Sequence, residues 1–470
     1  MASPPPKQPS PPLVQPAGTA WHETRALGQL AWPIVVGQVG MVTMGLVDVA
    51  VCGHEGADIL AAVGAGRIFS FGVVLFGLGA LRGLEPLFAQ AWGAGEHQQL
   101  PTALARCLAF AFAVSVPIAL LHLLCGPALT LLQQPPEIIP AAHEYASIRA
   151  VGVPAAFGFS AMAVWLQGQG RVRAPMLVVM IGNVINLILD LILIRGVELG
   201  AGWSIPAFGA SGCAWASNAV EFSWLLLLGW ICRDALRDAL RTPRRALWSA
   251  SAWQTMCSLG LPVGVQTSLE VWAFNVTGLM VGMLGAAALG AHVIAMQIIS
   301  FTFMVPFGIG AAASARVGNL VGAGHPWRRT GLIAVAMGTA WMAASALLLL
   351  VLGETVCRLF TTESKVLAVV LTLLPVAAVF QVADGVQAVA FGVLRGAGDT
   401  RVPAMMNVVA YWLVGLPVGW WVGLMVTKEP WGVWSGLVVG LVLVASLMMG
   451  RLWLVSGRQT LRVTSAAPPP

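Results

Sequence analysis

Long runs of apolar residues, broken by single Gly, Pro or charged positions, recur along almost the whole chain. A helix needs roughly 20 mostly apolar residues to cross a bilayer. The bounds of the runs predict twelve membrane-spanning helices, at 28–52, 59–91, 102–125, 141–166, 175–195, 207–231, 252–283, 286–321, 330–353, 366–393, 403–425 and 431–456. We therefore expect an all-α polytopic membrane protein.

The composition excludes a soluble globular enzyme. Of the 470 residues, 58% are hydrophobic and only 9% are charged, whereas soluble proteins carry about 25% charged residues. The chain has no GxxxxGK[ST] loop for ATP and no HExxH or GxSxG motif. The GxGD protease signature at 396–399 falls in a predicted basic loop and has no Tyr-Asp partner. We expect no enzyme activity, no prosthetic cofactor, no ATP and no nucleic acid as a partner.

The spans fall into two sets separated by a basic linker. The sequence predicts a disordered Pro-rich tail at 1–26, an N-terminal lobe of six spans at 27–231, a linker at 232–251, a C-terminal lobe of six spans at 252–456 and a tail at 457–470. Lys and Arg gather in alternate connections, and such residues favour the cytoplasmic side. Both termini should be cytoplasmic, in a bacterial-type inner membrane.

An internal repeat relates the two lobes. Residues 166–175 (LQGQGRVRAP) align with 394–403 (LRGAGDTRVP) at an offset of 228. Pro33 aligns with Pro262, and Gly-Ala-Gly at 93–95 aligns with Gly-Ala-Gly at 322–324, both at an offset of 229. An even number of spans per copy gives both copies the same orientation. We expect two six-helix lobes related by a pseudo-two-fold axis along the membrane normal.

Polar side chains within the first lobe form a candidate ion site. An ionisable group at mid-bilayer costs about 2.5–3.5 kcal/mol on insertion scales and usually marks an ion or substrate pathway. Asp48 and Asp190 lie near the outer ends of their spans, and Asn186 shares a helix face with Asp190. With Ser217 they offer oxygen ligands that suit Na⁺, or two carboxylates that share a proton.

The second lobe carries Glu270 and Asp384 near the middle of their spans, flanked by the amides Gln266, Gln381 and Gln387. These acids could bind Na⁺, exchange a proton or neutralise an organic cation. The alternative is that they are hydrogen-bonded structural acids. Among the remaining embedded polar residues, Glu221 faces either a cleft or a neighbouring side chain, and His292 is interpreted as a packing residue.

Two further features bear on shape change. Arg82 lies one helical turn before Glu85, and this pair is interpreted as structural or gating. Prolines inside spans permit bends, and Pro33 is the predicted hinge. Gly432, Gly436 and Gly440 repeat every four residues and should serve close packing within one chain. We expect a monomer.

The ordered set of motifs resembles the multidrug and toxic compound extrusion (MATE) family, especially its norfloxacin-extruding branch, over nearly the whole chain. The segments that carry the resemblance are 44–48 (MGLVD), 90–94 (QAWGA), 182–190 (GNVINLILD), 269–270 (LE) and 381–400 (QVADGVQAVAFGVLRGAGDT).

The resemblance implies a V-shaped antiporter that exports amphipathic, mostly cationic compounds against inward flow of Na⁺ or H⁺. It places Asp48, Asn186, Asp190 and Ser217 in the family's first-lobe ion site, and Glu270 and Asp384 in its second-lobe acidic pair. A flippase or exporter of a lipid-linked or anionic metabolite, from the same wider superfamily, is the alternative. Small molecules and the lipid bilayer are the expected partners.

Overall fold

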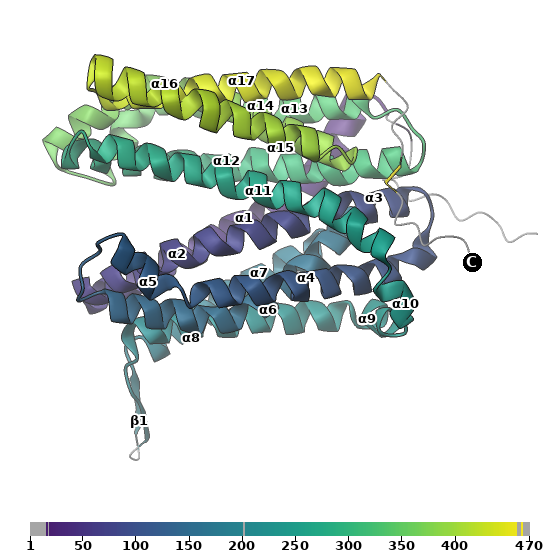
Figure 1. Cartoon of the computed structure of the whole chain (residues 1–470), viewed down its shortest axis with the longest axis horizontal. Helices are drawn as coiled ribbons and strands as arrows, with labels where there is room; N and C mark the ends of the chain where they lie inside the picture. Colours follow the sequence, from purple (N-terminus) through teal and green to yellow (C-terminus); the bar gives the residue numbers. More distant parts are fainter. Residues whose placement is uncertain (1–15, 17, 201–202, 458–461, 464–470) are drawn as a thin grey trace, which may run out of the picture.

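The computed structural model describes residues 16, 18–200, 203–457 and 462–463, and nearly all of them are helical (Figure 1). We call α1–α8 the N-terminal helix group and α11–α17 the C-terminal helix group. The first comprises α1 (Ala20–Glu55), α2 (Ala57–Arg82), α3 (Glu85–Gly93), α4 (Leu100–His122), α5 (Cys125–Leu131), α6 (Ile139–Gly168), α7 (Arg173–Leu193) and α8 (Gly209–Ile231). A β-hairpin of β1 (Val197–Gly200) and β2 (Trp203–Ile205) joins α7 to α8.

The linker forms two short helices, α9 (Arg233–Leu240) and α10 (Arg244–Leu247). The C-terminal helix group comprises α11 (Ala250–Gly282), α12 (Ala286–Gly322), α13 (Arg328–Arg358), α14 (Ser364–Gly396), α15 (Arg401–Val408), α16 (Leu416–Trp420) and α17 (Pro430–Ser456). Two π-helical segments, η3 (Val409–Gly415) and η4 (Trp421–Thr427), make one continuous helix with α15 and α16. Such wide turns occur mostly at functional sites.

Ten helical stretches in the described part of the chain are long and apolar enough to cross a bilayer, and they overlap ten of the twelve predicted spans. The prediction of a polytopic α-helical membrane protein is therefore confirmed. The helices α8 and α11 overlap the remaining two predicted spans but are not among the ten. Both are long enough to cross, at 23 and 33 residues, but Ser, Asn, Gln, Thr and Glu reduce their hydropathy.

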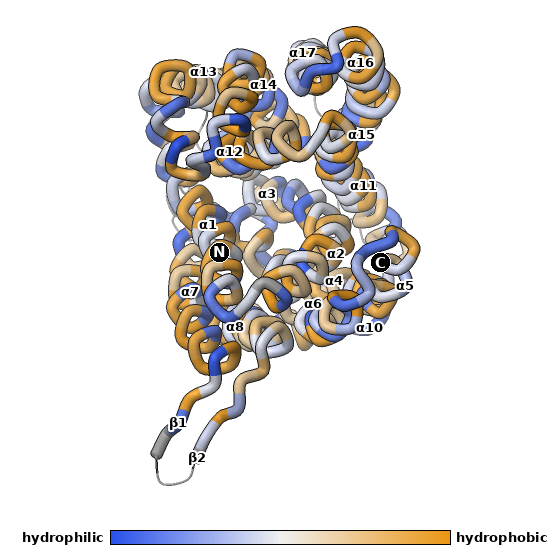
Figure 2. Tube along the Cα trace, turned by 90° about the vertical axis from the view of Figure 1, so that its left-hand side faces the viewer, coloured by the Kyte–Doolittle hydropathy of each residue, from blue (hydrophilic) through white to orange (hydrophobic). Residues whose placement is uncertain are grey.

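The two helix groups lie as two layers in both views (Figures 1 and 2). Large apolar side chains remain on the outer faces of both, among them Leu120, Leu226, Leu279 and Val351, which are at least 60% exposed. Exposed apolar surface on this scale marks an interaction with something other than water. In a polytopic membrane protein that surface faces lipid.

The helix α1 packs against both groups and changes partner near Pro33. Before it, Leu27, Leu30 and Ala31 belong to the hydrophobic core of the C-terminal helix group. After it, Gly40 lies against Met180 of α7. A proline removes a helical hydrogen bond and permits a bend. The predicted hinge therefore lies where α1 passes from one group to the other.

Close helix packing in the C-terminal helix group depends on glycine. A Cβ at Gly436 of α17 would overlap the backbone of Gly415 and Gly419, and one at Gly440 would press on the carbonyl of Ala410. These contacts lie within the chain, as predicted for the Gly432, Gly436 and Gly440 repeat.

The helices α3 and α12 cross in a contact that mirrors the sequence repeat. Asn319 Nδ2 donates to the Gly168 carbonyl at 3.1 Å, and Gln90 Nε2 donates to the Gly396 carbonyl at 3.1 Å. Asn319 lies 229 positions after Gln90, and Gly396 lies 228 positions after Gly168. The two hydrogen bonds are therefore equivalent under the repeat, and together they fasten one helix group to the other.

Candidate functional site

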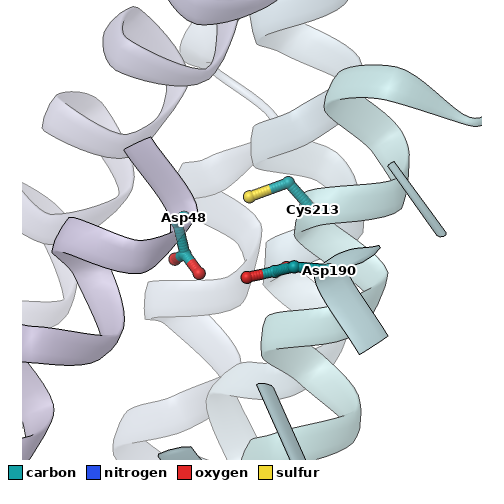
Figure 3. Close-up of side chains that lie close together, drawn as sticks. All are labelled: Asp48, Asp190 and Cys213. Atoms are coloured by element: carbon teal, nitrogen blue, oxygen red, sulfur yellow. The ribbon is translucent and has the colours of Figure 1, made fainter. Parts of the chain in front are cut away.

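The structure brings together three of the polar residues predicted in the first lobe. Asn186 Nδ2 donates to Asp48 Oδ1 at 3.1 Å, which joins α7 to α1. Asp190, one turn after Asn186, points toward Asp48 (Figure 3). Asp48 is 3% exposed, and Asn186 and Asp190 are fully buried. The spacing of four residues on α7 thus places an amide and a carboxylate against one carboxylate of α1.

A thiol takes the place expected for the Ser217 hydroxyl. One donor atom from each of Asp48, Asp190 and Cys213 lies within 4.8 Å of the other two. Ser217 is buried four residues later on α8, and no hydrogen bond joins its hydroxyl to either carboxylate. Cys213 and Ser217 share a face of α8, one turn apart. The sequence placed this face beside the acids but not its depth relative to them, so Cys213 was missed.

The predicted residues of the second lobe also converge, around Glu270 of α11. Its carboxylate accepts hydrogen bonds from Gln387 Nε2 at 3.4 Å and from Asn407 Nδ2 at 3.1 Å. Asp384 is 4% exposed and lies close enough to Glu270 for their charges to interact. Gln381 leaves both side-chain polar atoms without a hydrogen-bond partner. The site therefore retains polar groups that the protein itself does not satisfy.

Gln266 is buried in α11, one turn before Glu270, and its Oε1 also lacks a partner. Asn407 was not predicted, although a lone Asn in an otherwise apolar span was a visible signal.

An aromatic cluster lies beside these acids. Phe274 packs edge-on against Phe380 and Tyr411, with ring centroids 5.9 and 5.7 Å apart. Trp434 Nε1 is hydrogen-bonded to His292 Nδ1 at 3.1 Å, so the interpretation of His292 as a packing residue fits. Aromatic faces attract organic cations and bury apolar groups. Tyr411 comes from the π-helical segment η3, and its hydroxyl has no partner.

The interpretation of Glu221 as facing a cleft or a neighbouring Trp or Ser is wrong, because an arginine binds it. Arg149 of α6 approaches Glu221 at 2.5 and 3.1 Å and also donates to Asn218. Both charged side chains are largely buried. A bidentate Arg–carboxylate pair of this kind is structural.

The predicted local pair of Arg82 and Glu85 is also wrong. Glu85 pairs with Arg395 of α14 at 3.2 Å and accepts from Gln167 at 2.8 Å, while Arg82 lies over the Phe307 ring. The one-turn spacing is compatible with a pair, but tertiary packing offered Glu85 a better partner. Arg395 was placed in a cytoplasmic loop, whereas α14 continues through it and buries it.

A second ion pair joins the helix groups at the same end. Arg316 of α12 binds Glu23 of α1 at 2.7 and 3.2 Å, and Thr330 donates to the same carboxylate at 2.9 Å. Both charged side chains are fully buried. Sequence reasoning missed this pair because Glu23 lies in the predicted tail 1–26, whereas α1 begins at Ala20 and includes it. We call this end, with the Glu85–Arg395 pair and the α3–α12 crossing, the closed end.

Fold and sites define a polytopic membrane protein that keeps, in each of two helix groups, acids with no ion-pair partner among the residues that the structure describes. The family model MatE matches the chain twice, at residues 33–192 and 262–421, so the two halves are copies of one unit.

Relatives cover nearly the whole chain. The multidrug resistance protein NorM of Burkholderia vietnamiensis is 32% identical over 91% of this chain and 93% of its own. PmpM of Pseudomonas aeruginosa is 32% identical over 92% and 91%. The eukaryotic MATE transporter AtDTX14 has the same fold, with a TM-score of 0.83 at 22% identity over 95% and 100%. The chain belongs to the MATE family and is NorM-like, as the motifs indicated.

Proposed function

We propose that this chain is a secondary active multidrug efflux antiporter, which exports amphipathic, mostly cationic compounds in exchange for Na⁺ or H⁺. The observation that carries the proposal is the set of buried acids without a basic partner, Asp48 and Asp190 in one group and Glu270 and Asp384 in the other. An acid kept so in a membrane marks an ion or substrate pathway. The names of the relatives, multidrug resistance proteins, agree with it.

The proposed architecture has twelve spans, with α8 and α11 completing the ten. The two groups act as lobes related by the repeat, in a bacterial-type inner membrane with both termini cytoplasmic. Helices buried against neighbours cross a bilayer with more polar residues than lipid-facing ones. The paired hydrogen bonds of Gln90 and Asn319 support the pseudo-two-fold relation.

The mechanism is competition for carboxylates during alternating access. A lipophilic cation is held by Glu270 and Asp384 beside the aromatic cluster. Na⁺ or H⁺ then loads the acids, cancels the attraction and releases the compound. A ligand shifts the equilibrium between the inward-open and outward-open states only if it binds one of them more tightly. At least one acid must therefore hold Na⁺ or H⁺ in one state and not in the other.

The closed end is the proposed cytoplasmic gate. Contacts between the groups gather there, through Glu23–Arg316, Glu85–Arg395 and the α3–α12 crossing. Opening toward the cytoplasm separates the buried Glu85–Arg395 pair and the hydrogen bonds of Gln90 and Asn319, so the gate needs the free energy of substrate or ion binding to open. The bend at Pro33 lets the outer part of α1 move without breaking Glu23 from Arg316.

Efflux of tetraphenylphosphonium from proteoliposomes, under separately imposed Na⁺ and H⁺ gradients, tests the proposal. Wild-type protein should respond to at least one gradient, and Glu270→Gln should lose the response. The matched control is Glu354→Gln, an exposed acid that pairs with Arg358 on α13, which should leave efflux unchanged. No response of the wild type to either gradient would contradict antiport and favour a lipid-linked or anionic substrate. Full export by the triple variant Asp48→Asn, Glu270→Gln, Asp384→Asn would rule out the carboxylate mechanism.

A further inference from the structure

The acid site of the N-terminal helix group contains a sulfur ligand. Cys213 Sγ and one oxygen from each of Asp48 and Asp190 lie within 4.8 Å of one another (Figure 3). A site built for Na⁺ alone needs only oxygen ligands. Thiolates instead select soft or borderline metals such as Zn²⁺, and carboxylates complete many Zn²⁺ sites. The donor set therefore suits a thiophilic divalent cation.

Two buried side chains in this site leave polar atoms unsatisfied. Within the described part of the chain, both carboxylate oxygens of Asp190 and Oδ1 of Asn186 form no hydrogen bond of ordinary geometry, although both residues are fully buried. The polar neighbours of the Asp190 carboxylate are the Asp48 carboxylate and the Asn186 amide. Burying such groups without a partner is costly. Asp190 points toward Asp48 and the thiol (Figure 3), so a bound cation would satisfy atoms that the protein leaves free.

The charge at the site also favours a cation. Neither Asp48 nor Asp190 forms an ion pair among the described residues, because the nearby Arg149 is engaged by Glu221 at 2.5 Å. The other nearby cation, Arg67, donates to the backbone carbonyl of Gly45 rather than to a carboxylate. When a metal binds and displaces the proton of the Cys213 thiol to solvent, two carboxylates and a thiolate together carry three negative charges, more than one divalent ion neutralises.

Dimensions and access agree with a bound metal. Zn²⁺ ligands lie about 2.0–2.3 Å from the ion in a tetrahedral arrangement, so neighbouring donors are separated by about 3.5 Å. The three donor atoms of this site lie within 4.8 Å of one another, so small side-chain movements bring them to that spacing. Asp190 lies three residues before the end of α7, and Cys213 lies four residues after the start of α8. The site therefore lies about one helical turn from the loop that joins α7 to α8, and an ion entering from that side crosses only this depth.

We infer that Asp48, Asp190 and Cys213, with Asn186 Oδ1 as a fourth donor, form a site for a thiophilic divalent cation such as Zn²⁺ or Cd²⁺. An ion held there occupies both acids of the N-terminal helix group and stops transport. The binding claim stands on the donor set alone, while the inhibition claim rests on the proposed function.

Titration of purified, reduced protein with Cd²⁺ in Na⁺-free buffer tests binding. The sulfur-to-Cd²⁺ charge-transfer absorption should rise to one equivalent per chain. Cys52 of α1 lies beside Cys213, so the variant that should abolish the band is Cys52→Ser, Cys213→Ser, and Cys52→Ser alone should keep it. The control Cys107→Ser, a buried thiol of α4 outside the site, should also keep it. Absence of the band in the wild type, or its persistence in the double variant, would overturn the proposal.

A second variant keeps the binding claim testable if the double variant Cys52→Ser, Cys213→Ser does not fold. Asp190→Asn keeps the thiol but removes a ligand charge, so the Kd for Cd²⁺ should rise on the order of tenfold or more, and an unchanged Kd would overturn the site. In proteoliposomes, Cd²⁺ should inhibit efflux by the wild type and not by the double variant. Efflux that persists with Cd²⁺ bound would overturn the inhibition claim. A wild type without efflux but with the absorption band would contradict the proposed function and leave the metal site standing.

Discussion

The embedded acids of this protein differ between the closed end and the two acid sites. At the closed end, Glu23 and Glu85 each bind an arginine, at 2.7 and 3.2 Å. In the acid sites, Asp48, Asp190, Glu270 and Asp384 have no Arg, Lys or His within ion-pair distance in the part of the chain that the structure describes. We call the first kind paired acids and the second kind unpaired acids.

The difference separates holding a conformation from binding a ligand. A buried ion pair contributes little net stability over an apolar substitute, but removing one partner leaves an uncompensated charge. Paired acids therefore fasten the helix groups together. Unpaired acids instead lower the stability of the fold. Such a cost is useful only at a position where a cation or a proton binds. Glu221 and Asp48 show both kinds within the N-terminal helix group.

The largest expected effect is at the paired acid Glu23. Glu23→Gln leaves the fully buried Arg316 guanidinium without its counter-charge. Breaking a buried pair from one side costs about 3–5 kcal/mol, so the free energy of unfolding should fall by that amount. Thermal unfolding in detergent measures it as a lower Tm.

The double variant Glu23→Gln, Arg316→Met is the control, since it removes both charges and should recover most of the loss. A single variant as stable as the wild type would show that Glu23 and Arg316 do not fasten α1 to α12.

A smaller effect, of opposite sign, is expected at the unpaired acid Asp190. Asp190→Asn removes a like charge beside Asp48, and two charges about 5 Å apart at an effective dielectric of 20 repel by roughly 3 kcal/mol. In Na⁺-free buffer the stability should rise by about 1–3 kcal/mol. The exposed Asp234→Asn on α9 is the control and should change nothing. A loss of stability at Asp190→Asn would mean that this acid is structural.

The lengths and bounds of the apolar runs predicted the helices well. Lipid leaves a spanning segment few alternatives to helix, and the sequence repeat was visible at 166–175 and 394–403. The convergence of Asp48, Asn186 and Asp190 was also predicted, because residues four apart share a helix face and the ends of spans have defined depths.

Tertiary partners were beyond the sequence. Cys213 and Ser217 lie on one face of α8, one turn apart. The choice between them depends on how deep packing sets α8 relative to Asp48 and Asp190. The partner of Glu85 was sought one turn away, while the true partner, Arg395, lies on α14 of the other helix group. The predicted span 366–393 left Arg395 in the loop that follows, but a positive charge near a helix end can equally be buried against an acid from another helix.

The smallest expected effect is at the surface of the closed end, where Arg462 binds Glu96 at 2.8 Å with both side chains about one-third exposed. Both pairs join an arginine to a glutamate, but the Glu23–Arg316 pair is fully buried and Glu23 accepts a further hydrogen bond from Thr330. Exposed pairs contribute at most about 1 kcal/mol and are screened by salt. Arg462→Ala should therefore lower the Tm slightly in low salt and not at all in 1 M NaCl, whereas the loss in Glu23→Gln should persist in both. An equal salt dependence for the two variants would show that burial does not separate the two pairs. If the difference holds, the contact of Arg462 can be released each time the gate opens at little cost, and the buried contacts that opening separates determine how strongly the closed end resists it.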